Sequence, residues 1–432
     1  MGRPACHGRR RRDRRRRAGD ARAGDAGRFR GAVPGGVVDH HVRGAADPGG
    51  ARRRRGLGHG RAARHVHRPE GRRRHRRAPR PGARHRADAR GVRRGHECHE
   101  HGDERGGLRV RIAYAPAGRR DAGTAVALAR QAEDLGFAEV WLSEDYLERG
   151  AFAVAGAVAA ATSRVGVGLG VINPWTRHVA LTAMECAALD EVSGGRLTVG
   201  LGASNQGWME GRLGIPFAKP ISTLEAYTAA LRRLLAGEVV REEVNGLPLD
   251  AGLSFAPLRT DVPLYLGVKG ERALSVGARV ADGLMLSVLS TPAYVRWIRE
   301  QHPRPDLRLT GYAAFSCDDD GALARDRVRS RSARFLGMHG ASPITAVPGL
   351  PADRATALRE RLLAGADGAD LVDDDVLRTF TLAGTPDEVA AGMRAFADAG
   401  LDTLVVMDDG VSPAAPALDA AAACARAAGL LA

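Results

Sequence analysis

The sequence predicts a TIM (β/α)8 barrel with insertions over residues 108–432, preceded by a disordered, arginine-rich segment over residues 1–107. The first observation behind this prediction is charge. Residues 1–107 hold 32 Arg, no Lys and 11 acidic residues, whereas residues 108–432 hold 33 basic and 39 acidic residues. The second is that short apolar strands alternate with amphipathic helices from Arg109 onward. About eight such units over roughly 325 residues favour a closed barrel over a doubly wound sheet.

The first 107 residues contain few large apolar side chains and several arginine runs, such as residues 9–12 and 52–55. Such a composition cannot bury a core and stays disordered. Three interpretations stay open: a basic arm that binds nucleic acid, a targeting peptide, and a non-functional extension from a start codon assigned too early. We favour the extension, because interleaved aromatic residues for base stacking and an apolar targeting core are both missing.

The cysteines and histidines predict neither a metal site nor disulfides. The five cysteines include no CxxC pair. His96, Cys98, His99 and His101 resemble a metal-binding cluster, but we interpret this as chance within an arginine-rich stretch. No apolar run reaches the length of a membrane span. These observations favour a reducing, cytoplasmic setting and no membrane contact.

Apolar periodicity and end signals define the strands and helices of the first half of the barrel. The expected strands are residues 109–115, 138–142, 164–171 and 196–201. The expected helices are residues 121–136, 152–162, 179–192 and 221–235. Gly136 and the pair Gly194-Gly195 mark helix ends, because glycine readily adopts the left-handed conformation in which many helices end.

The second half begins with an interruption of the alternation. Residues 238–244 and 247–255, joined by Asn245-Gly246, predict a β-hairpin. The expected strands then resume at residues 264–267, 283–287, 307–315 and 403–406. The expected helices are residues 271–280, 292–301, a long helix from about Gly321, 386–399 and 414–430, with an irregular stretch at 338–351. No GxGxxG motif follows the first strand, which argues against a Rossmann nucleotide site.

Polar and aromatic side chains follow the expected strands, at the barrel rim where such enzymes place their sites. Glu144 and Asp145 follow the second strand and are candidates for acid–base catalysis, unless one of them caps a helix or pairs with Arg149. Gly267, Val268, Lys269 and Gly270 follow the fifth strand and open a helix, an arrangement that suits a phosphate. The expected substrate pocket at this rim consists of Tyr146, Trp175, His178 and Ser287. For His178, a helix-start or packing role stays an open alternative.

Four ordered stretches resemble the luciferase-like flavin oxidoreductases. They are LARQAEDLGFAEVWLSEDY (128–146), VGLGVINPWTRHVALTAMECAALDEVSGGRLTVGLGAS (167–204), VPLYLGVKGERALSVGARVADGLML (262–286) and LAGTPDEVAAGMRAFADAGLDTLVV (382–406). Within that family, the chain looks most like the branch of methylenetetrahydromethanopterin reductase, which uses the deazaflavin coenzyme F-420. The resemblance implies a TIM barrel, in agreement with the count of strand–helix units.

The resemblance also implies where a ring cofactor is held. A bulge in the third strand would back the ring through Val171, Ile172 and Asn173, often with a non-prolyl cis peptide, here at Gly170–Val171 or its neighbour. The remaining implied contacts are the fourth-strand loop (Ala203, Ser204, Asn205) at the pocket wall and the turn Gly267–Gly270 at the ribityl-phosphate tail. Asp145 and Asn205 replace the histidine and the acid that are common in the family, so Glu144 and Asp145 are the nearby acids that remain.

The leading hypothesis is an oxidoreductase that transfers hydride between coenzyme F-420 and a small organic substrate. An FMN-dependent monooxygenase is the alternative among enzymes, because the same family uses both cofactors. A nucleic-acid-binding protein that uses the basic arm is the alternative of another class. A barrel that binds a flavin without turnover also stays open. The resemblance further implies a homo-oligomer.

Overall fold

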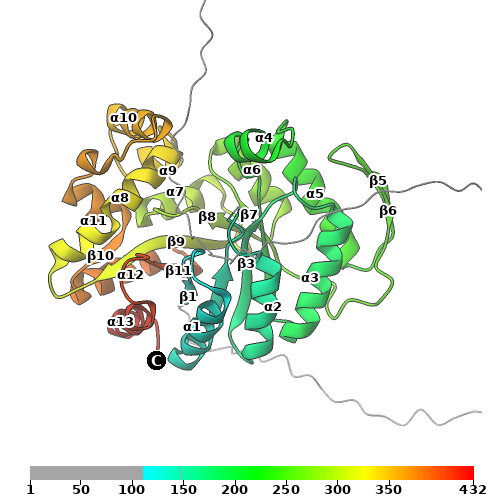
Figure 1. The fold of residues 1–432 in the computed structure, drawn as a ribbon, viewed down its shortest axis with the longest axis horizontal. Coiled ribbons are helices and arrows are strands. Elements are labelled where there is room, and N and C mark those ends of the chain that lie inside the picture. The colour runs from blue at the N-terminus through cyan, green and yellow to red at the C-terminus, as the bar shows by residue number, and fades with distance from the viewer. Residues whose placement is uncertain (1–109, 146) are drawn as a thin grey trace, which may run out of the picture. The chain divides into compact units, whose positions relative to one another are not determined.

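The structure, a computed structural model, describes residues 110–145 and 147–432. Within them, eight parallel strands close into a ring in the order β1-β2-β3-β4-β7-β8-β9-β11, and β11 pairs again with β1 (Figure 1). The strands of the ring are β1 (Arg111–Ala115), β2 (Glu139–Leu142), β3 (Gly166–Ile172), β4 (Leu197–Gly202), β7 (Leu264–Gly267), β8 (Gly283–Leu286), β9 (Arg308–Cys317) and β11 (Thr403–Asp408). The expected TIM barrel is confirmed.

A helix follows each strand and covers the outside of the ring. These helices are α1 (Ala122–Leu135), α2 (Ala151–Ala161), α3 (Val179–Ser193), α5 (Pro220–Leu235), α6 (Glu271–Val280), α7 (Pro292–Gln301), α12 (Pro386–Asp398) and α13 (Ala414–Ala427). Gly136 ends the first helix as expected, with a φ of 90°. Asp121, expected inside this helix, instead caps it by accepting from the N–H of Thr124.

Two insertions interrupt the ring of helices, on opposite sides in Figure 1. The first is the expected hairpin of β5 (Val240–Val244) and β6 (Leu247–Ala251), whose turn residues Asn245 and Gly246 have positive φ values of 56° and 75°. The second comprises α8 (Gly321–His339), α9 (Pro343–Ala346), α10 (Ala352–Leu363), η1 (Ala369–Leu371), α11 (Asp374–Phe380) and β10 (Leu382–Gly384). A further short helix, α4 (Gln206–Leu213), follows β4.

Four elements, α4, α10, α11 and β10, were not predicted from the sequence, and residues 338–351, predicted to be irregular, contain α9. The second insertion has its own small apolar core, which includes Leu336, Leu358 and Leu377. α10 buries only Ala355 and Leu358 among its 12 residues. Its apolar pattern is therefore too sparse to stand out in the sequence.

The barrel interior is a packed apolar cluster rather than a channel. Trp141, Tyr265, Met285 and Tyr312 fill it, and Phe335 from α8 packs against them. Within the described residues, no helix is long and apolar enough to cross a membrane, and no group of His, Cys, Asp and Glu is arranged to hold a metal ion. The arginine-rich segment, His96–His101 and Tyr146 lie outside the described residues.

Candidate active site at the barrel mouth

The third strand carries a bulge at its carboxyl end. Its pairing register with β4 shifts between Leu169 and Ile172, and the Gly170–Val171 peptide bond is cis, which confirms the bond implied by the family resemblance. The Val171 side chain reaches across the neighbouring strands. A Cβ atom built on Gly202 would lie 2.5 Å from Cγ2 of Val171, and one built on Gly267 would lie 2.9 Å from its Cγ1. Glycines on β4 and β7 therefore leave the space that the bulge occupies.

Large side chains lie directly beneath this bulge. A Cβ atom on Gly170 would collide with the hydroxyl of Tyr312, and it would lie within 2.9 Å of Trp141 and Met285. The Tyr312 hydroxyl is buried and has no hydrogen-bond partner among the described residues. Burial raises the pKa of Tyr312, so this hydroxyl keeps its proton and stays a donor. The mouth thus has an apolar floor with one unengaged donor beside the bulge.

The two candidate acids after β2 have different surroundings. Glu144 forms an ion pair with Arg177, at 2.6 Å between Oε2 and Nη1, and its side chain is 11% exposed. Arg149, which the sequence offered as a partner, instead donates to the backbone oxygen of Arg119. Asp145 is exposed and accepts a hydrogen bond from the Ser143 hydroxyl at 3.1 Å. Glu144 is therefore engaged by Arg177, whereas Asp145 is exposed and forms no ion pair among the described residues.

The loop after β3 is a tight turn tied to the loop after β4. The Asn173 side chain is buried and accepts from the backbone N–H groups of Trp175 and Thr176. The indole N–H of Trp175 donates to the backbone oxygen of Ala203 at 2.8 Å, and its ring packs against Phe217 with 5.1 Å between centroids. The Asn173 side chain therefore fixes the conformation of the loop after β3, which forms one side of the barrel mouth.

Two of the expected site residues start helices. The Nδ1 atom of His178 accepts from the N–H of Ala180 and caps α3, which is the helix-start alternative stated for it. The Asn205 Oδ1 atom accepts from the N–H of Trp208 and caps α4, next to Ser204 with its positive φ of 62°. Ser287 is half-buried, and its backbone oxygen accepts from the Ser290 hydroxyl.

The turn after β7 combines a cation with an open helix start. Gly270 has a φ of 111°, and no side chain caps α6 there. The Lys269 ammonium lies 3.4 Å from the backbone oxygen of Met338. Partial burial, and then the charge of Arg359, lower the pKa of Lys269. A helix start without a side-chain cap, next to the Lys269 ammonium, suits an anionic ligand.

The sequence analysis missed a charged cluster at the ends of β1 and β11. The Asp408 carboxylate accepts from the Tyr114 hydroxyl at 2.7 Å, from Arg120 at 2.9 Å and from the N–H of Gly410. Asp409 beside it accepts from Ser316 and Ser412 side chains. Asp408 ends β11 and Asp409 follows it, so this pair lies at the carboxyl end of the last strand, like the other candidate residues at the rim.

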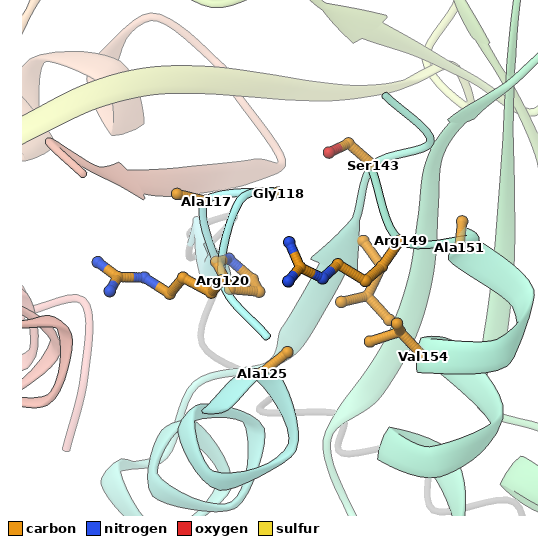
Figure 2. A pocket seen from close by; sticks show the side chains of 10 residues that line it. Ala117, Gly118, Arg120, Ala125, Ser143, Arg149, Ala151 and Val154 are labelled. Atoms are coloured by element: carbon orange, nitrogen blue, oxygen red, sulfur yellow. The ribbon is translucent and has the colours of Figure 1, made fainter. Parts of the chain in front are cut away.

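A small cavity lies between the segments that follow β1 and β2. Figure 2 shows Arg120 and Gly118 on the first segment, with Ser143 and Arg149 on the second. Its volume is about 30 Å³. That space suits water-sized molecules and is too small for a ring cofactor.

The comparisons with known proteins agree with this geometry. Residues 106–403 match the family model described as luciferase-like monooxygenase. The chain is 29% identical over 294 residues to 5,10-methylenetetrahydromethanopterin reductase of Methanolobus tindarius, which covers 64% of this chain and 87% of the relative. It is 27% identical over 303 residues to an F-420-dependent glucose-6-phosphate dehydrogenase of Amycolatopsis mediterranei, covering 65% and 86%.

Among solved structures, the coenzyme F-420-dependent tetrahydromethanopterin reductase of Methanopyrus kandleri shares the fold. Its TM-score is 0.62 at 24% identity, and the match covers 72% of this chain and 97% of that one. The family match spans most of the barrel, including the bulged third strand and the turn after β7. The chain therefore belongs to the luciferase-like monooxygenase family and is an oxidoreductase of that class.

Proposed function

We propose that this chain is an F-420-dependent oxidoreductase that transfers a hydride between the coenzyme and a small organic substrate. The observation that carries the proposal is the β3 bulge, which the glycines of β4 and β7 accommodate at the barrel mouth. The relative from Amycolatopsis mediterranei is named as F-420-dependent, which supports a deazaflavin over other ring cofactors.

The residues at the mouth fit such a coenzyme in two respects. The bulge (Val171, Ile172, Asn173) presents backbone and small apolar groups above a floor of Trp141, Met285 and Tyr312, which suits one face of a flat ring. The turn Gly267–Gly270 offers open N–H groups and the Lys269 ammonium, which suit a phosphate-bearing tail. Ala203, Ser204 and Asn205 would line the wall between them.

When bound, the deazaflavin would supply the carbon that gives or receives the hydride. The chain's own contribution is orientation and the coupled proton. Asp145 is the residue that we assign to this proton, because it is exposed and its side chain has no ion pair among the described residues. Glu144, engaged by Arg177, would position the loop instead.

An FMN-dependent monooxygenase is the second candidate, favoured by the family model's own description. Titrating the purified full chain with F-420 and with FMN, followed by absorption and fluorescence, decides between them. We expect saturable binding of F-420 and at least tenfold weaker binding of FMN. Tight FMN binding without F-420 binding would overturn the proposal.

The proton assignment has its own test with a matched pair of variants. Asp145→Asn should lower hydride-transfer rates by about 10²–10⁴-fold while F-420 affinity stays near that of the wild type. Glu144→Gln should change the rate much less, although it disturbs the pairing with Arg177. Equal losses in both variants would remove Asp145 from its assigned role.

A further inference from the structure

Arg331 of α8 is a partly buried cation without a matching carboxylate. Its Nη1 atom donates to the backbone oxygen of Asp408 at 2.7 Å, and its Nη2 atom lies 3.1 Å from the sulfur of Met407. Its guanidinium carbon lies 5.8 Å from the ring centroid of Phe335. Among the described residues, no carboxylate oxygen lies within ion-pair distance of it, and its side chain is half-buried. A guanidinium has five N–H donors, so several remain unused by these contacts.

The other buried and half-buried arginines of the same helix are all paired with carboxylates. Arg325 pairs with Asp374 and Glu388, Arg327 pairs with Asp318, and Arg329 pairs with Asp326 and Asp374. Asp408, whose backbone oxygen accepts from Arg331, has a carboxylate that is already engaged. Its carboxylate binds Arg120 and the Tyr114 hydroxyl, so only its backbone oxygen meets Arg331. Burial accordingly lowers the pKa of Arg331.

The position of Arg331 places this charge at the barrel mouth. Met407 and Asp408 form the carboxyl end of β11, and Phe335 packs against the interior cluster beneath the bulge. Arg331, Phe335 and His339 are spaced four residues apart, so they share one face of α8. His339 at the far end of this face contacts the backbone oxygen of Val288, just after β8. This face of α8 therefore spans the mouth between β11 and β8.

The charge is also within electrostatic range of the proposed proton-transfer acid. The negative charge of Asp145 opposes the effect of burial on Arg331, as that of Asp408 does. A half-buried guanidinium with spare donors is the kind of group that binds carboxylates or phosphates in two-point contact.

We propose that Arg331 anchors a negatively charged group of the substrate, a carboxylate or a phosphate, so that the substrate is a small organic anion. This inference rests on the proposed function, because it takes the barrel mouth as the place where substrate meets coenzyme. The anion would complete the pairing that no described side chain supplies. The rest of the substrate would then lie over Phe335 and toward Asp145.

The test is calorimetric titration of the full chain with inorganic phosphate and with succinate, at ionic strength held constant with chloride. Four proteins are compared, with and without F-420: wild type, Arg331→Gln, Arg331→Lys and Arg334→Gln. Arg334 is the matched control, because it lies on the same helix but is exposed. We expect the wild type and Arg334→Gln to bind at least one anion, and Arg331→Gln to bind it about ten- to a hundredfold more weakly.

Arg331→Lys keeps the positive charge but lacks the two-pronged set of N–H donors, so its affinity for the anion should lie between those of the wild type and Arg331→Gln. This variant also guards against misfolding of Arg331→Gln. The inference is overturned if Arg331→Gln binds both anions as the wild type does, or if the wild type binds neither. It is also overturned if Arg331→Gln loses F-420 affinity while Arg334→Gln keeps it, since the coenzyme would then use this charge. Anion binding by a wild type that binds no F-420 would refute the proposed function and leave the anchor standing.

Discussion

Replacing Gly202 with alanine should destabilise the barrel through one identifiable contact. The new Cβ atom would lie 2.5 Å from Cγ2 of Val171 and 3.3 Å from its Cβ, whereas the nearest backbone atom beyond them, the oxygen of Gly267, is 3.7 Å away. The obstacle is therefore a single isopropyl group. Overpacking of this kind costs about 1–3 kcal/mol, so we expect a loss of about 2 kcal/mol in the free energy of unfolding.

The second substitution, Val171→Ala, should rescue the first. Alone, it removes two partly buried methyl groups and should cost about 1 kcal/mol. Together with Gly202→Ala it removes the 2.5 Å contact and leaves the two Cβ atoms 3.3 Å apart, which is tight but requires only a small shift. The double variant should therefore be more stable than the sum of the two single changes predicts, by at least 1 kcal/mol.

Gly200→Ala serves as the matched control. Its Cβ atom would meet the sulfur of Met285 and would lie 2.5 Å from the backbone oxygen of Leu169, which no side-chain substitution removes. Val171→Ala should not rescue it. The assay is urea unfolding of the coenzyme-free chain, followed by circular dichroism. Additive losses for Gly202→Ala and Val171→Ala, or equal rescue of both glycine variants, would refute the packing argument.

Three further predictions concern charged groups away from the mouth or at its edge. Burial lowers the pKa of His339 to about 4, so the fold is favoured at a pH above 6.5, where this side chain is neutral. As the pH falls from 6.5 to 4, the free energy of unfolding should drop by about 3 kcal/mol. Urea unfolding of the wild type should show this drop across the range, and His339→Gln should not. Partial burial acts to raise the pKa of Glu133, but hydrogen bonds from three backbone N–H groups outweigh it and lower the pKa to about 2. Glu133→Gln should therefore lower the free energy of unfolding by about 1–2 kcal/mol at pH 7. In urea unfolding, this difference from the wild type should disappear as the pH falls from 4.5 to 2. The Asp190 side chain is 1% exposed and binds Arg259 through both carboxylate oxygens, so Asp190→Ala should lower the free energy of unfolding by about 3 kcal/mol. The control is Asp250→Ala, which removes an ion pair with Arg241 whose side chains are both about 70% exposed. This control should change the free energy of unfolding by less than about 0.5 kcal/mol.

The barrel was predictable because its signals are local. Each ring strand is a short apolar run, and several helices carry their own end signals, such as Asp121 and Gly136 for α1. The helices of the second insertion (α8 to α11) were harder to predict, because contacts among them, rather than signals within each segment, stabilise them. In α10, Ala355 and Leu358 become buried only when α8 and α11 are in place. A pattern read along one segment contains no information about that partner surface.

The position of the candidate residues at the barrel rim was predictable, but their pairing was not. The rule that polar residues after parallel strands meet at one rim placed Glu144, Asp145 and the turn after β7 on the same side of the barrel. It could not show that Glu144 pairs with Arg177, 33 residues away, rather than with the nearer Arg149. Closure of the barrel decides such contacts, because it brings together groups whose separation in sequence is large. The bond between Tyr114 and Asp408 spans 294 residues.

The pairing pattern at the mouth gives a reason to treat two residues together. Glu144 is matched by Arg177, and Asp408 by Arg120 and Tyr114. Asp145 and Arg331 are an acid and a guanidinium at the mouth that form no ion pair among the described residues. A partly buried guanidinium such as that of Arg331 is normally paired, because an uncompensated charge there opposes folding. If an anionic substrate pairs with Arg331, the same contact holds the rest of that substrate near Asp145, the group that we propose for the coupled proton. The anchor and the proton-transfer residue would then act on one substrate, held in one orientation.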